Sequence, residues 1–109
     1  MNGDYGALRP QRFTANGSFG SVRGVLFHSM IVTHVSNARA VVNLRNGSAG
    51  APILVPFDLR APATPPLEPQ RRYVSSVTMD DRGLAITNTR GFLRVSGQST
   101  AATVFFRNI

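Results

Sequence analysis

The chain has 109 residues, enough for one domain with one modest core, and its 42% hydrophobic content excludes a fully disordered chain. It has no Cys, which excludes disulfides, thiolate chemistry and most structural zinc sites. Its basic residues are twelve Arg and no Lys against five acidic residues, so the net charge of +7 favours anionic partners such as nucleic acid, acidic lipid or an acidic protein surface.

The first 20 residues predict a flexible N-terminal arm. This stretch contains four Gly and few apolar residues, with one short strand expected around residues 12–14. Its first 11 residues lack the apolar run of a signal peptide, and no stretch of the chain reaches the roughly 18 apolar residues of a membrane span. We therefore expect an arm over residues 1–20 that either frays or docks on a neighbour, and a folded domain over residues 21–109.

Residues 22–35 are rich in β-branched and apolar side chains and predict a long strand. If the strand is continuous, we expect both of its faces to be largely buried. The two His residues would lie about 20 Å apart along it, too far to bind one metal ion, so each is expected to be a hydrogen-bonded or exposed histidine. One face would carry Phe27, Ser29, Ile31, Thr33 and Val35, and the other His28, Met30, Val32 and His34.

Residues 38–59 predict a β-hairpin. Residues 38–45 alternate between apolar side chains, such as Val42 and Leu44, and more polar ones, as expected of a half-buried strand. Asn46 and Gly47 are typical of a tight turn because both tolerate positive φ. Residues 53–59 then return as a second strand, in which Pro56 lacks a backbone donor and should lie at a sheet edge or a bulge.

Six of the seven Pro residues lie between positions 52 and 69, and we expect residues 61–70 to be a stiff Pro-rich crossover between two sheets. Short strands are expected beyond it over residues 73–78, 84–87, 91–96 and 101–107, separated by turn sequences. No window of the sequence sustains an amphipathic helical pattern. The chain therefore predicts an all-β fold, a single β-sandwich or barrel of about seven to eight antiparallel strands with an extended N-terminal arm.

The sequence offers little catalytic chemistry. Asp80 and Asp81 are adjacent and would point to opposite faces of a strand, so they do not converge on one substrate atom. Neither His lies in a recognisable nucleophile motif, and the glycine motifs that bind phosphate groups are absent. We therefore expect a binding or assembly protein that is not an enzyme and that has no cofactor and no metal.

Arginine is the basic residue best suited to planar contacts at interfaces, so the Arg residues are the first candidates for an interaction site. The alternative is that they are spread over solvated strand faces. The predicted arm contributes three candidates, the predicted hairpin two, and the end of the Pro-rich stretch two. These candidate interface residues are Arg9, Arg12, Phe13, Arg39, Arg45, Arg71 and Arg72.

Single-stranded nucleic-acid binding is a further possibility. Phe92 with Arg94, and Phe105 with Arg107, are spaced two residues apart, so each pair shares one face of a strand. Barrels that bind single strands place aromatic and basic side chains in this way. The absence of Trp and the presence of only two Tyr leave few residues for base stacking.

Three segments carry a resemblance to a known class. Residues 44–47 end a strand with Leu, Arg, Asn and Gly; residues 91–97 read GFLRVSG; and residues 101–106 form a strand of Ala, Thr, Val and Phe. In this pattern the chain resembles small β-sandwich structural proteins of tailed bacteriophages. The N-terminal arm and the long Pro-rich crossover depart from the pattern.

The resemblance implies a non-catalytic virion protein that is assembled in the cytoplasm of the bacterial host. The expected form is a capsid decoration or cement protein that binds the head lattice, with the major capsid protein or another virion protein as its partner. It would act as a homo-oligomer or in repeated copies. The alternative within this class is a neck, tail or fibre-anchoring adaptor; no membrane partner is expected.

Overall fold

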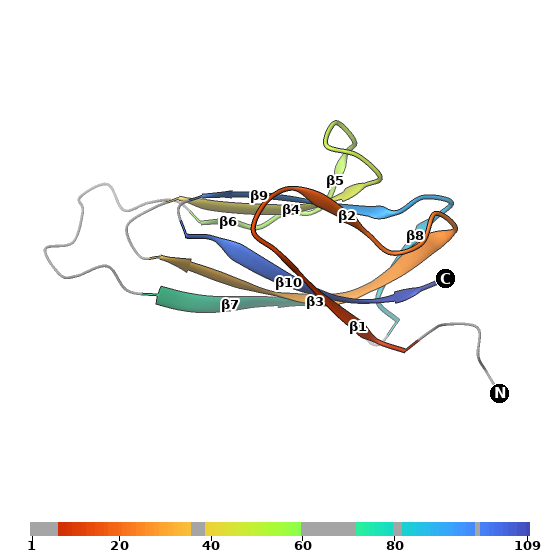
Figure 1. Cartoon of the computed structure of the whole chain (residues 1–109), viewed down its shortest axis with the longest axis horizontal. Helices are drawn as coiled ribbons and strands as arrows, with labels where there is room; N and C mark the ends of the chain where they lie inside the picture. Colours follow the sequence, from red (N-terminus) through yellow and green to blue (C-terminus); the bar gives the residue numbers. More distant parts are fainter. Residues whose placement is uncertain (1–6, 36–38, 60–71, 80–81, 98) are drawn as a thin grey trace, which may run out of the picture.

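The computed structural model describes residues 7–35, 39–59, 72–79, 82–97 and 99–109, and all regular secondary structure in these ranges is β (Figure 1). The strands form two antiparallel five-stranded sheets that pack on each other, so the expected all-β sandwich is confirmed. The described ranges hold ten strands, more than the seven or eight expected. They are β1 (Arg9–Phe13), β2 (Gly17–Phe19), β3 (Gly24–Val35), β4 (Ala40–Asn46), β5 (Ile53–Val55), β6 (Asp58–Leu59), β7 (Arg72–Thr78), β8 (Leu84–Thr87), β9 (Gly91–Gly97) and β10 (Ala101–Asn108).

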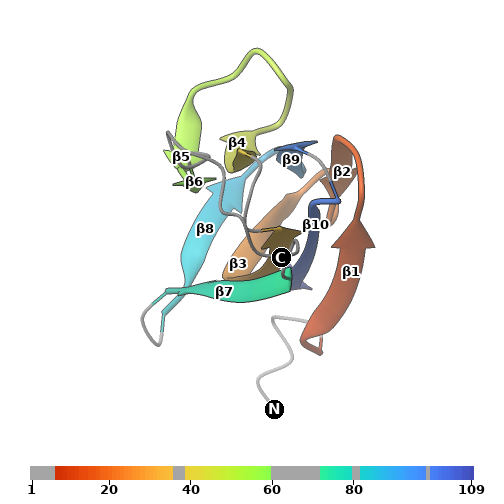
Figure 2. The same ribbon diagram turned by 90° about the vertical axis from the view of Figure 1, so that its left-hand side faces the viewer.

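We call the two sheets sheet A and sheet B. Sheet A has the strand order β1-β10-β3-β7, and β8 also pairs with β3; sheet B has the order β2-β9-β4-β5, and β6 also pairs with β4. The view in Figure 2 places β1 and β2 at one margin of the sandwich and β5 and β6 at the opposite margin. The inner faces of both sheets supply the core, and its largest fully buried side chains are Val25, Phe27, Met30, Val32, Val42, Leu44, Leu93 and Val104.

The predicted alternation along residues 22–35 holds from Ser29 to His34 but is wrong at Phe27 and His28. Phe27 and Met30 are both fully buried although they are three residues apart. The pairing with β10 shifts at this point, because Phe105 pairs with Ser29 whereas Phe106 pairs with Phe27, and His28 is the extra residue. This β-bulge keeps both Phe27 and Met30 in the core and leaves His28 exposed. The other face of β3 is exposed or half-buried from Leu26 to Thr33, so both faces are not largely buried as expected; Val35, at the end of the strand, is buried.

The prediction of a flexible arm is wrong for residues 9–19, because this segment contributes one strand to each sheet. β1 pairs with β10, and β2 pairs with β9. Phe13 and Phe19 are both buried, with their ring centroids 6.0 Å apart. Gly17 allows this packing, because a Cβ atom there would lie 2.7 Å from the Phe13 ring. Residues 1–6 of the expected arm lie outside the described residues.

The predicted hairpin is present, but Pro56 divides its second strand. β5 and β6 both pair with β4 at the edge of sheet B, as expected for a strand that contains Pro56. The predicted apolar face of the first strand is confirmed, since Val42 and Leu44 are fully buried, although Asn43 on the other face is also buried. Gly47 has the positive φ of 90° expected at the turn. The expected Pro-rich crossover, residues 61–70, lies outside the described residues. The strands on either side of it, β6 and β7, belong to different sheets.

Candidate interaction surface

The outer face of sheet A carries basic and apolar side chains together. Thr103 pairs with Arg12 on one side and with Ile31 on the other, and Thr33 pairs with Val74. Paired residues of neighbouring strands share a face, and the residues that alternate with them along β3 are buried, so these side chains face outward. We call this surface the basic face. It comprises Arg12, Leu26, His28, Ile31, Thr33, Arg72, Val74, Thr103, Phe105 and Arg107.

The charge on the described residues is almost entirely positive. Asp58 is the one acidic residue in the described ranges, and it lies in sheet B, outside the basic face. Its carboxylate accepts two hydrogen bonds from Arg39, at 3.1 and 2.7 Å. The hydrogen bond and the negative charge of Asp58 raise the pKa of Arg39 above its ordinary value. The basic face therefore has no acidic side chain among the residues that the structure describes.

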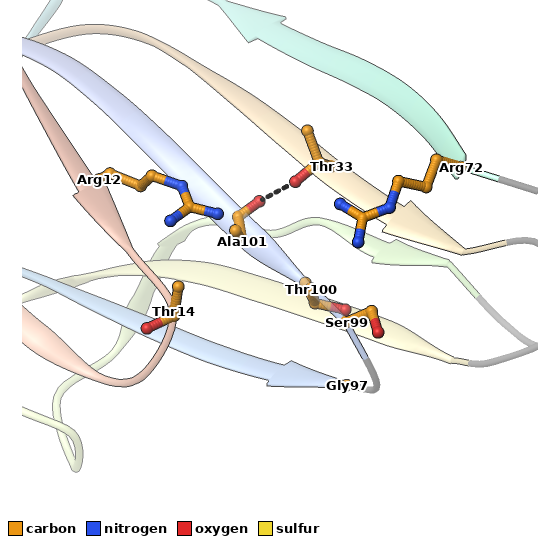
Figure 3. A pocket seen from close by; sticks show the side chains of 8 residues that line it. All are labelled: Arg12, Thr14, Thr33, Arg72, Gly97, Ser99, Thr100 and Ala101. Carbon is orange, nitrogen blue, oxygen red and sulfur yellow. Dashed lines mark hydrogen bonds between the residues drawn. The ribbon is translucent and has the colours of Figure 1, made fainter.

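One end of the basic face contains a hollow of about 290 Å³ at the turn between β9 and β10. Arg12 extends from β1 and Arg72 from β7, and their guanidinium groups approach Ala101 from either side (Figure 3). In the described part of the chain neither of these two Arg residues forms an ion pair. Four hydroxyl side chains complete the lining together with Gly97; they are Thr14, Thr33, Ser99 and Thr100. We call this site the two-arginine hollow.

The turn that forms the floor of the hollow is held in an unusual backbone conformation. Gly97 has a φ of 134° and Ser99 a φ of 52°, both in the region that L-residues rarely adopt. The hydroxyl of Thr33 donates a hydrogen bond of 3.4 Å to the carbonyl oxygen of Ala101. This bond joins β3 to the first residue of β10, at the point where Arg12 and Arg72 approach.

The opposite end of the basic face contains a second hollow, of about 220 Å³, which is also basic. It is lined by Leu26, His28, Arg82, Gly83 and Arg107. The imidazole Nδ1 of His28 lies 2.8 Å from the hydroxyl oxygen of Ser29, so the bulged residue is hydrogen-bonded at the surface. Basic groups therefore flank the apolar middle of the face at both ends.

The structure brings together two of the seven candidate interface residues, Arg12 and Arg72. Arg9 is exposed on β1, and Arg39 is engaged by Asp58. Arg45 pairs with Phe92 in sheet B and donates a hydrogen bond of 2.8 Å to the carbonyl oxygen of Ala51. Arg71 lies outside the described residues.

Phe13, the seventh candidate, lies in the hydrophobic core and not at the surface. Its side chain is 6% exposed, and the strand that carries it is part of sheet A. The sequence pattern does not indicate that Ile31 and Val74 are surface residues, although they are 38% and 70% exposed. No local signal identifies them, because an apolar residue in a β-branched strand reads as a core residue until the strand pairing is known.

The aromatic and basic pairs considered for nucleic-acid binding lie on opposite sides of the sandwich. Phe105 and Arg107 face outward from sheet A, since Phe106, which lies between them, and Val104, which precedes Phe105, are buried. Phe92 and Arg94 face outward from sheet B by the same alternation around buried Leu93 and Val95. Each pair shares a strand face as predicted. The two pairs do not form one stacking surface.

Among the described residues, no group of three His, Cys, Asp or Glu side chains is placed to hold a metal ion. His34 is buried, its Nε2 lies 3.1 Å from the hydroxyl oxygen of Ser75, and its ring stacks on Tyr73 at 5.9 Å. The expectation that His34 is a hydrogen-bonded histidine is therefore confirmed. The described ranges also contain no helix with the length and hydropathy needed to cross a membrane.

Comparison with known proteins identifies no relative of this chain. No protein-family model, no curated protein and no solved structure matches it.

Proposed function

We propose that this protein is a non-enzymatic structural protein of a tailed-bacteriophage virion, a decoration or cement protein that attaches to the head lattice through the basic face. The phage context comes from the resemblance of residues 44–47, 91–97 and 101–106 to that class. The observation that carries the proposal is the two-arginine hollow, where Arg12 and Arg72 approach one site on a face without a described acidic residue.

The chemistry of the basic face suits attachment to an acidic protein surface. A guanidinium group presents a planar set of donors that matches a carboxylate, and hydrogen bonds between charged groups are the stronger ones. Ile31 and Val74 provide exposed apolar area beside the arginines. Protein interfaces combine an apolar centre with Arg and aromatic residues in this way, whereas Lys, which this chain lacks, is depleted there.

The proposal is tested by adding the purified protein to phage heads that lack it and measuring how much sediments with the heads. The double variant Arg12→Gln/Arg72→Gln should bind more than about tenfold more weakly, because two charge-assisted hydrogen-bonding groups are lost. Added salt should weaken binding of the parent protein.

The matched control is Arg23→Gln/Arg94→Gln, which removes the same charge from exposed positions outside the basic face. This variant should bind almost as the parent does. Equal loss of binding in both double variants would show that net charge, not the basic face, governs attachment.

The location in the particle is tested by the parent protein itself. No binding of the parent to heads would overturn the head assignment. About six to twelve copies per particle, instead of hundreds, would indicate the neck or tail adaptor.

A nucleic-acid binder would behave differently in a second assay. The proposal predicts only weak, salt-sensitive binding to a short single-stranded oligonucleotide, due to the charge of +7. A micromolar or tighter complex at about 0.15 M salt, lost in Phe105→Ala while the melting temperature is kept, would replace the proposed function with single-strand binding.

A further inference from the structure

We infer that two copies of this chain associate through their β7 strands, edge to edge, to form one continuous sheet. β7 is the last strand of sheet A, and its only partner among the described strands is β3. Its seven residues, RYVSSVT, carry no charge after Arg72. Tyr73 and Val74 are 48% and 70% exposed, so the strand presents apolar side chains as well as one open edge. An exposed, long and apolar edge strand is a template for pairing with another chain.

The other edges of the sandwich are protected against such pairing. β1 contains Pro10, which cannot donate a backbone hydrogen bond, and two exposed Arg residues. β2 and β5 have three residues each, β6 has two and β8 has four. Proline, charge and short length are the usual means of blunting an edge. Within the described ranges, β7 is therefore the edge strand that is long and free of Pro, and its one charge, Arg72, lies at its first residue.

The sequence of β7 is self-complementary in an antiparallel arrangement centred on Ser75. In that register Tyr73 lies opposite the partner's Val77, and Val74 lies opposite the partner's Ser76. Arg72 lies opposite the partner's Thr78, so no like charges face each other across the pair. This arrangement has two-fold symmetry, and it pairs the β7 edge of each copy with the β7 edge of the other. It therefore forms a closed dimer and does not extend into a fibre.

The pairing also preserves the inner and outer faces of sheet A. Val74 faces outward with Thr33, and Tyr73 faces inward with His34. Opposite residues share a face, so the outer faces of the two copies join into one surface. A dimer would therefore present two basic faces side by side. The inference stands on the edge alone and does not require the proposed attachment to phage heads.

The test is sedimentation velocity of the purified full chain over a concentration range of about 1 to 500 µM, without any other partner. The parent protein should shift from the mass of one chain, 11.8 kDa, to twice that mass as its concentration rises. Val74→Lys places a charge on the edge strand and should weaken the dimer by about tenfold or more. Because Val74 is exposed, the melting temperature of this variant should stay close to that of the parent.

Two control variants decide between β7 and other surfaces. Val22→Lys changes an apolar residue that is 65% exposed between β2 and β3, and Ile31→Lys changes the centre of the basic face; both should still dimerise. Amide hydrogen exchange of residues 73–78 should slow at the concentrations that give dimer. The inference is overturned if the parent is monomeric throughout the range. It is equally overturned if the dimer survives Val74→Lys, or if Ile31→Lys dissociates it as strongly as Val74→Lys does.

Discussion

Phe13 provides the most direct test of how the N-terminal residues contribute to the fold. Its side chain is 6% exposed and packs edge-on against Phe19, whose ring centroid lies 5.1 Å from that of Phe106. The three rings come from β1, β2 and β10 and so connect both sheets. Replacing Phe13 with Ala removes the outermost ring of this cluster and leaves a cavity beside Phe19.

The expected cost is about 3 to 5 kcal/mol, the usual range for truncating a buried Phe to Ala. A domain of this size has a free energy of unfolding of about 5 to 15 kcal/mol, so the loss is a large fraction of the total. For about 100 residues, each kcal/mol lowers the melting temperature by about 4 to 8 °C, so a fall of at least about 12 °C is expected. Thermal and urea unfolding, followed by circular dichroism, measure it.

The matched control is Gln11→Ala on the same strand, where the side chain is exposed and the change should lie within about 0.5 kcal/mol. By the same reasoning, removal of residues 1–17 should unfold the protein, because it deletes β1 together with Phe13. If Phe13→Ala lies within about 1 kcal/mol of the parent, or if the truncated chain keeps the parent's melting temperature, β1 is a dispensable arm and not part of the folded core.

The remaining predictions concern glycines and the surface ion pair. Gly91→Ala should lower the free energy of unfolding by about 1 to 3 kcal/mol in a urea titration, because the new Cβ would overlap the Phe19 ring. Gly97→Ala should cost a similar amount, about 1 to 3 kcal/mol, because φ is 134° there; an unchanged urea midpoint would contradict this. Arg39→Gln should change the melting temperature little, because its ion pair with Asp58 is exposed. The raised pKa of Arg39 means that its contribution is complete below the ordinary pKa of a guanidinium and is lost only at more alkaline pH, so the difference between parent and variant should be constant from about pH 6 to 9.

Local features of the sequence were sufficient to identify several elements. The alternation in residues 38–45 predicted the buried side chains of β4, and Asn46 with Gly47 predicted the turn that follows it. Pro56 predicted an edge position because its lack of a backbone donor is a property of the residue itself. By contrast, the Gly residues near the N-terminus suggested a flexible arm. Gly17 is instead required by the close approach of the Phe13 ring, which the sequence does not reveal.

The all-β class and most strand positions follow from local sequence patterns, because side-chain alternation and turn chemistry depend on residues that are close together in the chain. The pairing of the strands, the bulge at His28 and the face of each strand that meets solvent depend on how distant segments pack together. The candidate site also depends on strand order. Arg12 and Arg72 are 60 residues apart in the sequence, and they line one hollow because sheet A places β1 and β7 on either side of β10 and β3. Strand pairing of this kind depends on contacts between distant segments and on the fit of two apolar faces, and no local pattern specifies it.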